Sequence, residues 1–414
     1  MLSPSSGRPG AITLWQMETA RPSPGRVLIA GAGVAGLETA LALRAFAGDR
    51  ARVEALDPGD ALTLAAESTA HPFGRAPRRR PLAPLAERAG LHLRRGRLEE
   101  VLAGDRIALT DRGEAIGYDR LVVATGARPE PALEGAVAFS GPGDVAGVRR
   151  LFGRVVRGGR RGLHTRLAVV VPPGASWPLP AYELTLQLDR MLRRRGVRKL
   201  VILTLVTSED APLGIFGTRA AEAVAADLAD AGIVTRPGSV VRDWSWGQLS
   251  LIPSGTLAVD RVLALPTLRG PAIPGLPCDS HGFVQADADG RVPGAPGVYA
   301  VGDAGSFPVK QGGIACQQAD AVASLIAREL GADAEPIPFE PVLRGWLWDG
   351  DGGRFLRADL PGGRTESAGV TSETSPLWAP SGKVACRFLS SALRGEPGAG
   401  RLADRDLGQE APAR

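Results

Sequence analysis

The alternation of apolar and polar residues predicts a βαβ unit near the start of the chain. Two short apolar runs, 26–30 and 52–56, flank a stretch with helical periodicity over 37–46. Short, continuous apolar runs are typical of strands buried in a parallel sheet. A strand, a helix and a second strand therefore follow one another over 26–57.

The turn between the first strand and the helix has the spacing G-x-G-x-x-G, formed by Gly31, Ala32, Gly33, Val34, Ala35 and Gly36. The first glycine allows the tight turn, the second lets a pyrophosphate approach the backbone, and the third lets the helix pack on the sheet. The helix N-terminus adds free N–H groups and the positive end of its dipole. Asp57 ends the second strand and can accept hydrogen bonds from ribose hydroxyls. The stretch predicts a dinucleotide site, and a glycine-rich turn without a ligand is the alternative.

A second α/β unit is predicted over 149–265. Its first strand, 167–171, leads into PPGASWPLPAYE rather than into a glycine-rich turn. The four prolines remove backbone N–H donors, and Trp177 fills space that a pyrophosphate would need. We therefore expect a dinucleotide-type fold with an altered phosphate cradle. Glu209 and Asp210 follow its second strand, where they would be a ribose-binding acid, loop charges or a helix N-cap.

Two later strands end in small residues that let a cofactor approach the backbone. Thr125 and Gly126 follow the strand 121–124, and Gly302 and Asp303 follow the strand 298–301. The predicted fold class is α/β, with two Rossmann-like domains and a small C-terminal segment. The expected parts are a disordered extension over 1–25, a discontinuous first domain over 26–148 and 266–330, an inserted domain over 149–265, and a partly flexible segment over 331–414.

Composition and charge limit the classes of partner that we expect. The formal net charge is +5, but the arginine clusters are scattered and lack interleaved aromatic residues, so we expect no nucleic-acid partner. No apolar run of 18 residues occurs, and we expect a cytoplasmic protein without a membrane span. The aromatic and basic C-terminal segment packs on the core, lines a hydrophobic ligand site or rests on the inner membrane face.

The three cysteines, Cys278, Cys316 and Cys386, form no C-x-x-C pair. An odd and sparse set argues against a disulfide framework and fits a reducing compartment. We also assign no metal ligands, and we expect Cys316 to be an inert buried thiol.

Four stretches together resemble the FAD-dependent pyridine nucleotide-disulfide oxidoreductase superfamily. They are GAGVAGLE with Asp57, ATG at 124–126, GVYAVGDA at 297–304 and the altered unit between them. The resemblance covers about residues 26–330. It implies that the glycine motif holds the FAD pyrophosphate, that Asp57 holds the adenosine ribose and that Asp303 hydrogen-bonds the ribityl chain.

Within this superfamily the chain is similar to sulfide:quinone oxidoreductases, flavocytochrome c sulfide dehydrogenases and type II NADH:quinone oxidoreductases. The sulfide-oxidising branch has a cysteine where Trp177 stands and another just after the GD pair, where this chain has Gly305 and Ser306. A disulfide relay at the flavin needs two thiols that can meet, and Cys316 alone does not supply it. GIACQQAD at 313–320 is similar to the A-Q-x-A-x-Q-Q segment near the quinone pocket of the type II enzymes.

The resemblance implies an FAD-dependent oxidoreductase that passes electrons from NAD(P)H or another small reductant to a quinone-like acceptor. Lys310, in the P-x-K stretch, would stabilise negative charge on the reduced flavin, with a surface lysine as the alternative. Gln317 or Gln318 would donate to a quinone carbonyl or make polar contacts on the helix face, and Trp177 would stack on or shield one flavin face. An NAD(P)H-dependent reductase of a small molecule or electron carrier is one alternative. A flavin-binding structural or sensing protein without catalysis is another. Donor, acceptor and oligomeric state are left open.

Overall fold

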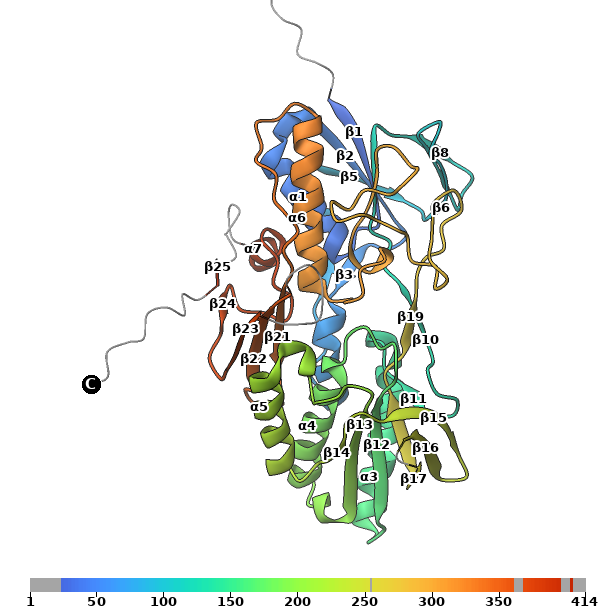
Figure 1. Ribbon diagram of the computed structural model, residues 1–414, viewed down its shortest axis with the longest axis vertical. Coiled ribbons are helices and arrows are strands. Elements are labelled where there is room, and N and C mark those ends of the chain that lie inside the picture. The colour runs from blue at the N-terminus through green and yellow to red at the C-terminus, as the bar shows by residue number, and fades with distance from the viewer. Residues whose placement is uncertain (1–23, 254, 361–367, 396–402, 405–414) are drawn as a thin grey trace, which may run out of the picture.

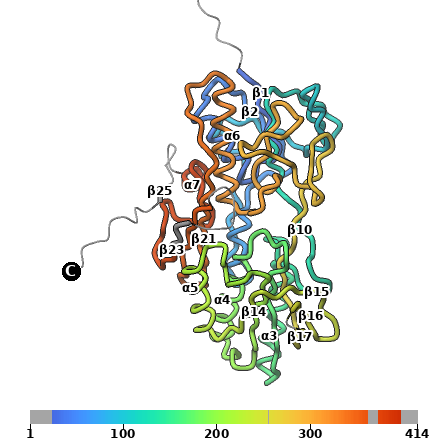
Figure 2. Tube along the Cα trace, in the orientation of Figure 1, coloured from blue at the N-terminus to red at the C-terminus, as the bar shows by residue number. Residues whose placement is uncertain are grey.

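The computed structural model describes residues 24–253, 255–360, 368–395 and 403–404. Two α/β parts lie one above the other in Figure 1, and the C-terminal segment lies along one side of their junction. The chain crosses between the parts through two antiparallel strands, β10 (Arg128–Glu130) and β19 (Thr267–Arg269), as Figure 2 also shows for β10. The predicted α/β fold with two Rossmann-like parts and a C-terminal segment is confirmed. The expected disorder over 1–25 concerns residues that, up to residue 23, lie outside the described ranges.

The upper part is built on a parallel five-stranded sheet. Its order is β20 (Val298–Ala300), β9 (Arg120–Val123), β1 (Gly25–Ala30), β2 (Ala51–Asp57) and β5 (Leu91–Arg95). Helices α1 (Val34–Phe46) and α6 (Gly312–Glu329) pack against each other beside this sheet (Figure 1). The central strands are buried because their apolar runs face covered layers on both sides.

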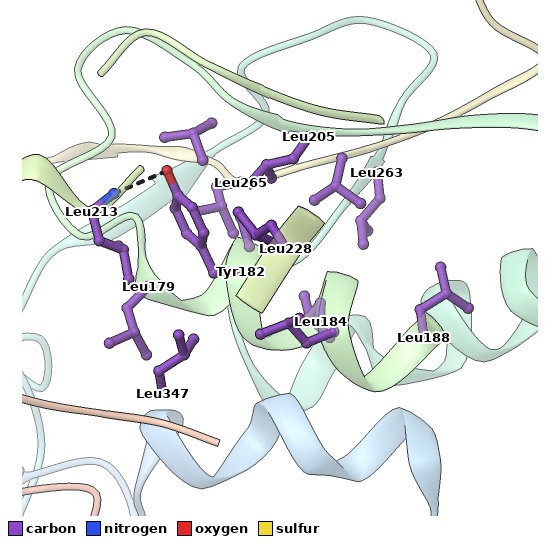
Figure 3. Close-up of a cluster of buried hydrophobic side chains, with 14 of the residues drawn as sticks. Leu179, Tyr182, Leu184, Leu188, Leu205, Leu213, Leu228, Leu263, Leu265 and Leu347 are labelled. Carbon is purple, nitrogen blue, oxygen red and sulfur yellow. Dashed lines mark hydrogen bonds between the residues drawn. The ribbon is translucent and has the colours of Figure 1, made fainter. Parts of the chain in front are cut away.

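The lower part has a second five-stranded parallel sheet. Its order is β11 (Val137–Ala138), β18 (Arg261–Ala264), β12 (Thr165–Val171), β13 (Val201–Thr207) and β14 (Val234–Arg236). Helices α3 (Val145–Arg160), α4 (Leu179–Arg194) and α5 (Thr218–Asp230) accompany it. Figure 3 shows its leucine-rich core around α4. Helix α3 was not predicted from the sequence, although its buried positions recur at helical spacing, at Val145, Val148, Leu151, Phe152 and Val155.

Smaller elements complete the two parts. The short strands and helix of the upper part are β3 (Ala61–Thr63), β4 (Arg79–Pro81), α2 (Leu82–Ala89), β6 (Leu98–Leu102), β7 (Ile107–Thr110) and β8 (Ala115–Gly117). The lower part carries an antiparallel sheet of β15 (Val240–Ser245), β16 (Gln248–Ile252) and β17 (Gly255–Ala258). The 3-10 turns are η1 (Gly48–Arg50), η2 (Ala65–Phe73), η3 (Pro142–Asp144), η4 (Arg198–Leu200), η5 (Gly214–Phe216) and η6 (Gly302–Ala304).

The C-terminal segment is more ordered than predicted. Strands β21 (Val342–Leu347), β22 (Arg354–Asp359) and β23 (Ala368–Glu373) form an antiparallel sheet. Strand β23 lies within the segment 331–414 that is predicted to be partly flexible, and it forms because β22 offers its free edge to residues 368–373. Two short strands, β24 (Trp378–Ala379) and β25 (Ala403–Asp404), and the helix α7 (Leu389–Arg394) follow. Among the described residues no helix is long and apolar enough to cross a membrane.

The cysteine prediction is wrong in one respect. Cys316 on α6 forms a disulfide with Cys386, and their Cα atoms lie 5.3 Å apart. The two residues are separated by 70 positions in sequence, and only the packing of the C-terminal segment on α6 brings them together. Cys278 is a free, half-buried thiol.

Candidate functional site

The glycine-rich turn has the geometry that a dinucleotide cradle requires. Gly31 has a φ of 109°, and a Cβ added to it would lie 2.4 Å from the carbonyl oxygen of Ala124. A Cβ on Gly36 would lie 1.8 Å from the carbonyl oxygen of Gly31, so the helix and the turn touch there. A Cβ on Gly33 meets nothing within 4 Å, and no side chain caps the N-terminus of α1. The turn therefore leaves open space and free N–H groups where a pyrophosphate would lie.

The predicted ribose-binding acid lies beside this turn. One carboxylate oxygen of Asp57 accepts a hydrogen bond from the backbone N–H of Ala32 at 2.7 Å, and the other accepts from Gly59 N–H at 2.6 Å. These two bonds fix the carboxylate at the end of β2, next to the first residues of α1. Asp57 is half-buried, so a ribose can still reach it.

A cavity of about 510 Å³ starts at the cradle and runs along the carboxyl ends of the upper strands to the junction between the two parts. Most of the residues predicted from the sequence line it. These are Gly31, Gly33, Val34, Ala35, Asp57, Thr125, Gly126, Trp177, Gly302, Asp303 and Lys310. Ala32 and Gly36 do not line the cavity, but Ala32 N–H donates to Asp57 and Gly36 packs against the Gly31 carbonyl. The residues present fit FAD, because the open space at Gly33 and the acid of Asp57 belong to the same cavity.

Lys310 and Asp303 form one charged part of the cavity wall. The Lys310 ammonium donates to the carbonyl oxygen of Gly305 and lies 4.0 Å from the ring centroid of Phe283. Burial lowers the pKa of Lys310 to about 8, against the opposing effect of the Asp303 carboxylate. Burial also raises the pKa of Asp303, which Lys310 opposes. The alternative of a surface lysine is excluded, because Lys310 is 7% exposed.

The predicted Gln317 does not line the cavity. Its amide nitrogen donates to the carbonyl oxygens of Gly313 and Val342, and its amide oxygen accepts from Val342 N–H at 2.8 Å. The side chain joins α6 to the first residue of β21. The neighbouring Gln318 lies nearer the cradle, where its oxygen accepts from Gly302 N–H at 2.8 Å.

Trp177 closes the cavity from the lower part. Its ring packs edge-on against Phe216, with the ring centroids 5.9 Å apart. Ala175 and Ser176 line the cavity beside it, and Ser176 accepts a hydrogen bond from the backbone N–H of Lys310. The proline-rich loop is thus a wall of the predicted FAD cavity.

A buried ion pair in the same cavity was not predicted. The ammonium of Lys383 contacts the carboxylate of Glu183 and donates to the carbonyl oxygen of Trp346 at 2.8 Å. Glu183 is 1% exposed and also accepts from Trp348 N–H at 2.8 Å. Burial lowers the pKa of Lys383, and the Glu183 carboxylate opposes this shift. Glu183 could be placed on a predicted helix, but no pattern in the sequence marks its partner 200 residues later.

Glu209, the acid after the second strand of the lower part, is hydrogen-bonded within the core. Glu209 accepts hydrogen bonds from the hydroxyls of Tyr182 at 2.6 Å and Thr207 at 2.8 Å. The Tyr182 hydroxyl in turn accepts from Leu213 N–H at 3.2 Å (Figure 3). Burial raises the pKa of Glu209. Glu209 is therefore engaged by the core rather than presented to a ribose.

We expect Tyr182→Phe to destabilise the protein by about 1–3 kcal/mol, because Glu209 would lose one of its two hydroxyl donors and Leu213 N–H its acceptor. Urea unfolding of the two proteins measures the difference. Bound-flavin absorbance should be unchanged, since neither Tyr182 nor Glu209 lines the cavity. Equal unfolding midpoints would show that the hydroxyl contributes nothing to the core.

Solved structures of known proteins share this fold. Sulfide:quinone oxidoreductase from Aquifex aeolicus is 20% identical, with a TM-score of 0.74 over 84% of this chain and 86% of that one. A ferredoxin reductase from Rhodopseudomonas palustris is 21% identical, with a TM-score of 0.60 over 81% and 82% of the two chains. At these identities the likeness establishes the fold alone. Comparison with curated protein sequences finds no significant match.

A family model described as pyridine nucleotide-disulphide oxidoreductase matches residues 25–319, more than half of the chain. The match includes the glycine-rich turn, the whole lower sheet and the GD pair that lines the cavity. It confirms the predicted superfamily and, together with the cradle, FAD as the cofactor. The chain therefore belongs to the pyridine nucleotide-disulphide oxidoreductase family.

Proposed function

We propose that this protein passes electrons from a small reductant, through FAD, to a quinone. The observation that carries the proposal is the continuity of one cavity, which joins the dinucleotide cradle to a compartment with Trp177, Lys310 and the Lys383–Glu183 pair. FAD, when bound, supplies the two-electron chemistry. Sulfide:quinone oxidoreductase and ferredoxin reductase, both with this fold, transfer electrons to a quinone and to an electron carrier, which supports the same class of acceptor here.

Each of these cavity residues would have a separate role. The N-terminus of α1 and Asp57 would bind the dinucleotide part, and Asp303 would bind near the reacting ring. Lys310 would stabilise negative charge that develops beside it, because its ammonium is already desolvated and fixed. Lys383 is a desolvated proton carrier that can serve an acceptor in the same cavity, with Glu183 to balance its charge.

The donor is proposed to be a small reductant such as sulfide rather than NAD(P)H. The lower part lacks a glycine-rich turn, its loop carries Trp177 into the cavity, and Glu209 is engaged by Tyr182. The second candidate is an NAD(P)H-dependent reductase of a small molecule or carrier, favoured by the parallel sheet of the lower part. Contact of the C-terminal segment with a membrane stays a prediction.

Anaerobic titration of the flavoprotein tests the proposal. We expect excess sulfide to bleach the flavin absorbance, because two hydrosulfide ions can combine into one HSS− ion and release a proton as two electrons pass to the flavin. NADH and NADPH should have little effect, and a short-chain ubiquinone should restore the colour. Bleaching by NADH or NADPH, with no reaction with quinone, would support the second candidate. Absence of bleaching by all three reductants would favour a flavin-binding protein without catalysis.

The lowered pKa of Lys310 predicts a pH dependence. Because its pKa is about 8, the ammonium is charged below pH 8 and loses its proton above it. The rate of flavin reduction should therefore fall about tenfold per pH unit at pH values well above 8 if only the charged form acts. Lys310→Arg should keep its charge and remove the alkaline decline, whereas Lys310→Met should be slow at all pH values. Stopped-flow rates between pH 6 and 10 check this, and an unchanged alkaline limb in both variants would contradict it.

A further inference from the structure

A cluster of buried reactive groups lies behind the cavity wall, where α1, α6 and the C-terminal segment meet. It consists of Glu38 on α1, Cys316 and Asp320 on α6, and Cys386 just before α7. Both cysteines are 1% exposed and Glu38 is fully buried. A Glu38 carboxylate oxygen and the two sulfurs all lie within 4.8 Å of one another. The function proposed above uses none of these groups.

The cluster fastens the part of the chain that completes the cavity. Lys383 and Val384 line the cavity, and a Cβ on Gly312 of α6 would lie 2.9 Å from Val384. Beyond them, Glu38 accepts hydrogen bonds from Phe388 N–H at 2.9 Å and Leu389 N–H at 2.6 Å. The disulfide is the only covalent link among the described residues between this segment and α6.

The two carboxyl groups of the cluster hold a proton between them. Burial and the neighbouring Glu38 carboxylate raise the pKa of Asp320 to about 9, while Arg387, 4.0 Å away, opposes this. The Asp320 carboxyl interacts with Glu38, and its buried Oδ1 accepts no hydrogen bond from an N–H donor among the described residues. At neutral pH the pair therefore stores a proton within reach of the two sulfurs.

We propose that Cys316 and Cys386 form a reversible dithiol–disulfide site, and that its reduction by a dithiol releases residues 383–394 from α6 and opens the cavity wall. The dithiol loses two hydrogens and becomes a cyclic disulfide, while the sulfur–sulfur bond breaks and Cys316 and Cys386 each gain a hydrogen. Glu38 and Asp320 deliver a proton to the leaving sulfur, because a bare thiolate at this depth is poorly solvated.

The release of residues 383–394 from α6 has a direct consequence for the cavity. Without the covalent link, the segment is held by the two hydrogen bonds to Glu38, the Arg387–Asp320 pair, apolar packing around Phe388 and the Lys383–Glu183 pair. Movement of residues 383–394 withdraws Lys383 from Glu183 and Val384 from Gly312. The reduced protein should therefore exchange its bound FAD faster than the oxidised protein.

The full-length flavoprotein provides the test. It is incubated anaerobically with dithiothreitol, then denatured with a maleimide-linked polymer that adds mass to every free thiol. We expect one labelled cysteine, Cys278, before reduction and three after it, with return to one on reoxidation. Deuterium exchange of residues 383–394 and the rate of FAD release should each rise at least tenfold on reduction, with no change in the lower sheet.

Matched variants separate the steps. Cys278→Ser should respond to dithiothreitol as the natural protein does. Cys386→Ser should show fast deuterium exchange of residues 383–394 and fast FAD release without dithiothreitol, and no further change with it. Asp320→Asn should slow reduction of the disulfide about tenfold at pH 7 and make the rate of this reduction less dependent on pH. Deuterium exchange of residues 383–394 in the oxidised protein should be unchanged. If Cys386→Ser does not fold, reduction and reoxidation of the natural protein still test the proposal. The proposal would be overturned if the three thiols resisted oxidation, or if reduction left deuterium exchange of residues 383–394 and FAD release no faster. None of these readouts depends on quinone or sulfide activity.

Discussion

Gly33→Val should give a folded protein that has lost its affinity for FAD by at least about 100-fold. The valine Cβ would enter the open space of the cradle, since no protein atom lies within 4 Å of that position. Gly33 has a φ of −76°, which valine adopts without strain, so the substitution blocks the ligand rather than the fold. A bulky side chain there keeps the pyrophosphate away from the N–H groups of α1, and a tenfold loss corresponds to about 1.4 kcal/mol.

Fluorescence titration of the apoprotein with FAD measures the affinity, and circular dichroism with urea unfolding measures the fold. Gly104→Ala is the matched control, because a Cβ there also meets nothing within 4 Å and the residue lies outside the cavity lining. Gly36→Ala should behave differently from both, with marked destabilisation, because its Cβ would overlap the Gly31 carbonyl. Normal FAD affinity in Gly33→Val would show that the cofactor does not lie on this turn.

The cradle could be predicted from the sequence because its geometry is local. The turn residues, α1 and Asp57 all lie within 26–57, and the close contact of Gly36 with the Gly31 carbonyl lies within the same turn. The altered cradle of the lower part could also be predicted, since the prolines and Trp177 occupy one short loop. Helix α3 was not predicted, although Val148, Leu151 and Val155 recur at helical spacing, and the glycines of this segment have a low helix propensity.

The rest of the site depends on contacts between distant parts of the chain. Cys316 and Cys386, like Glu183 and Lys383, meet because the C-terminal sheet packs across both α/β parts. No periodicity encodes such a pairing. Gln317 shows the opposite error, because its place in a family-like segment suggested a ligand contact while its amide serves the backbone of β21.

Lys383→Met should cost about 3–5 kcal/mol in the free energy of unfolding and slow quinone reduction at least tenfold. The loss of stability follows from leaving the Glu183 carboxylate buried without its cation. The loss of rate follows if Lys383 delivers a proton to the acceptor. Arg44→Met is the control for removal of a cation, because the exposed Arg44–Asp49 pair should contribute only about 0–1 kcal/mol.

The double variant Lys383→Met with Glu183→Gln separates the two effects. It removes both charges, and the glutamine oxygen can still accept from Trp348 N–H, so stability should return to within about 1–2 kcal/mol of the natural protein. Quinone reduction should stay slow, because the proton carrier is still missing. Urea unfolding and anaerobic stopped-flow reoxidation of the reduced flavin by quinone measure the two quantities. Recovery of the rate together with the stability would show that the pair only supports the cavity, whereas recovery of stability alone assigns the proton step to Lys383.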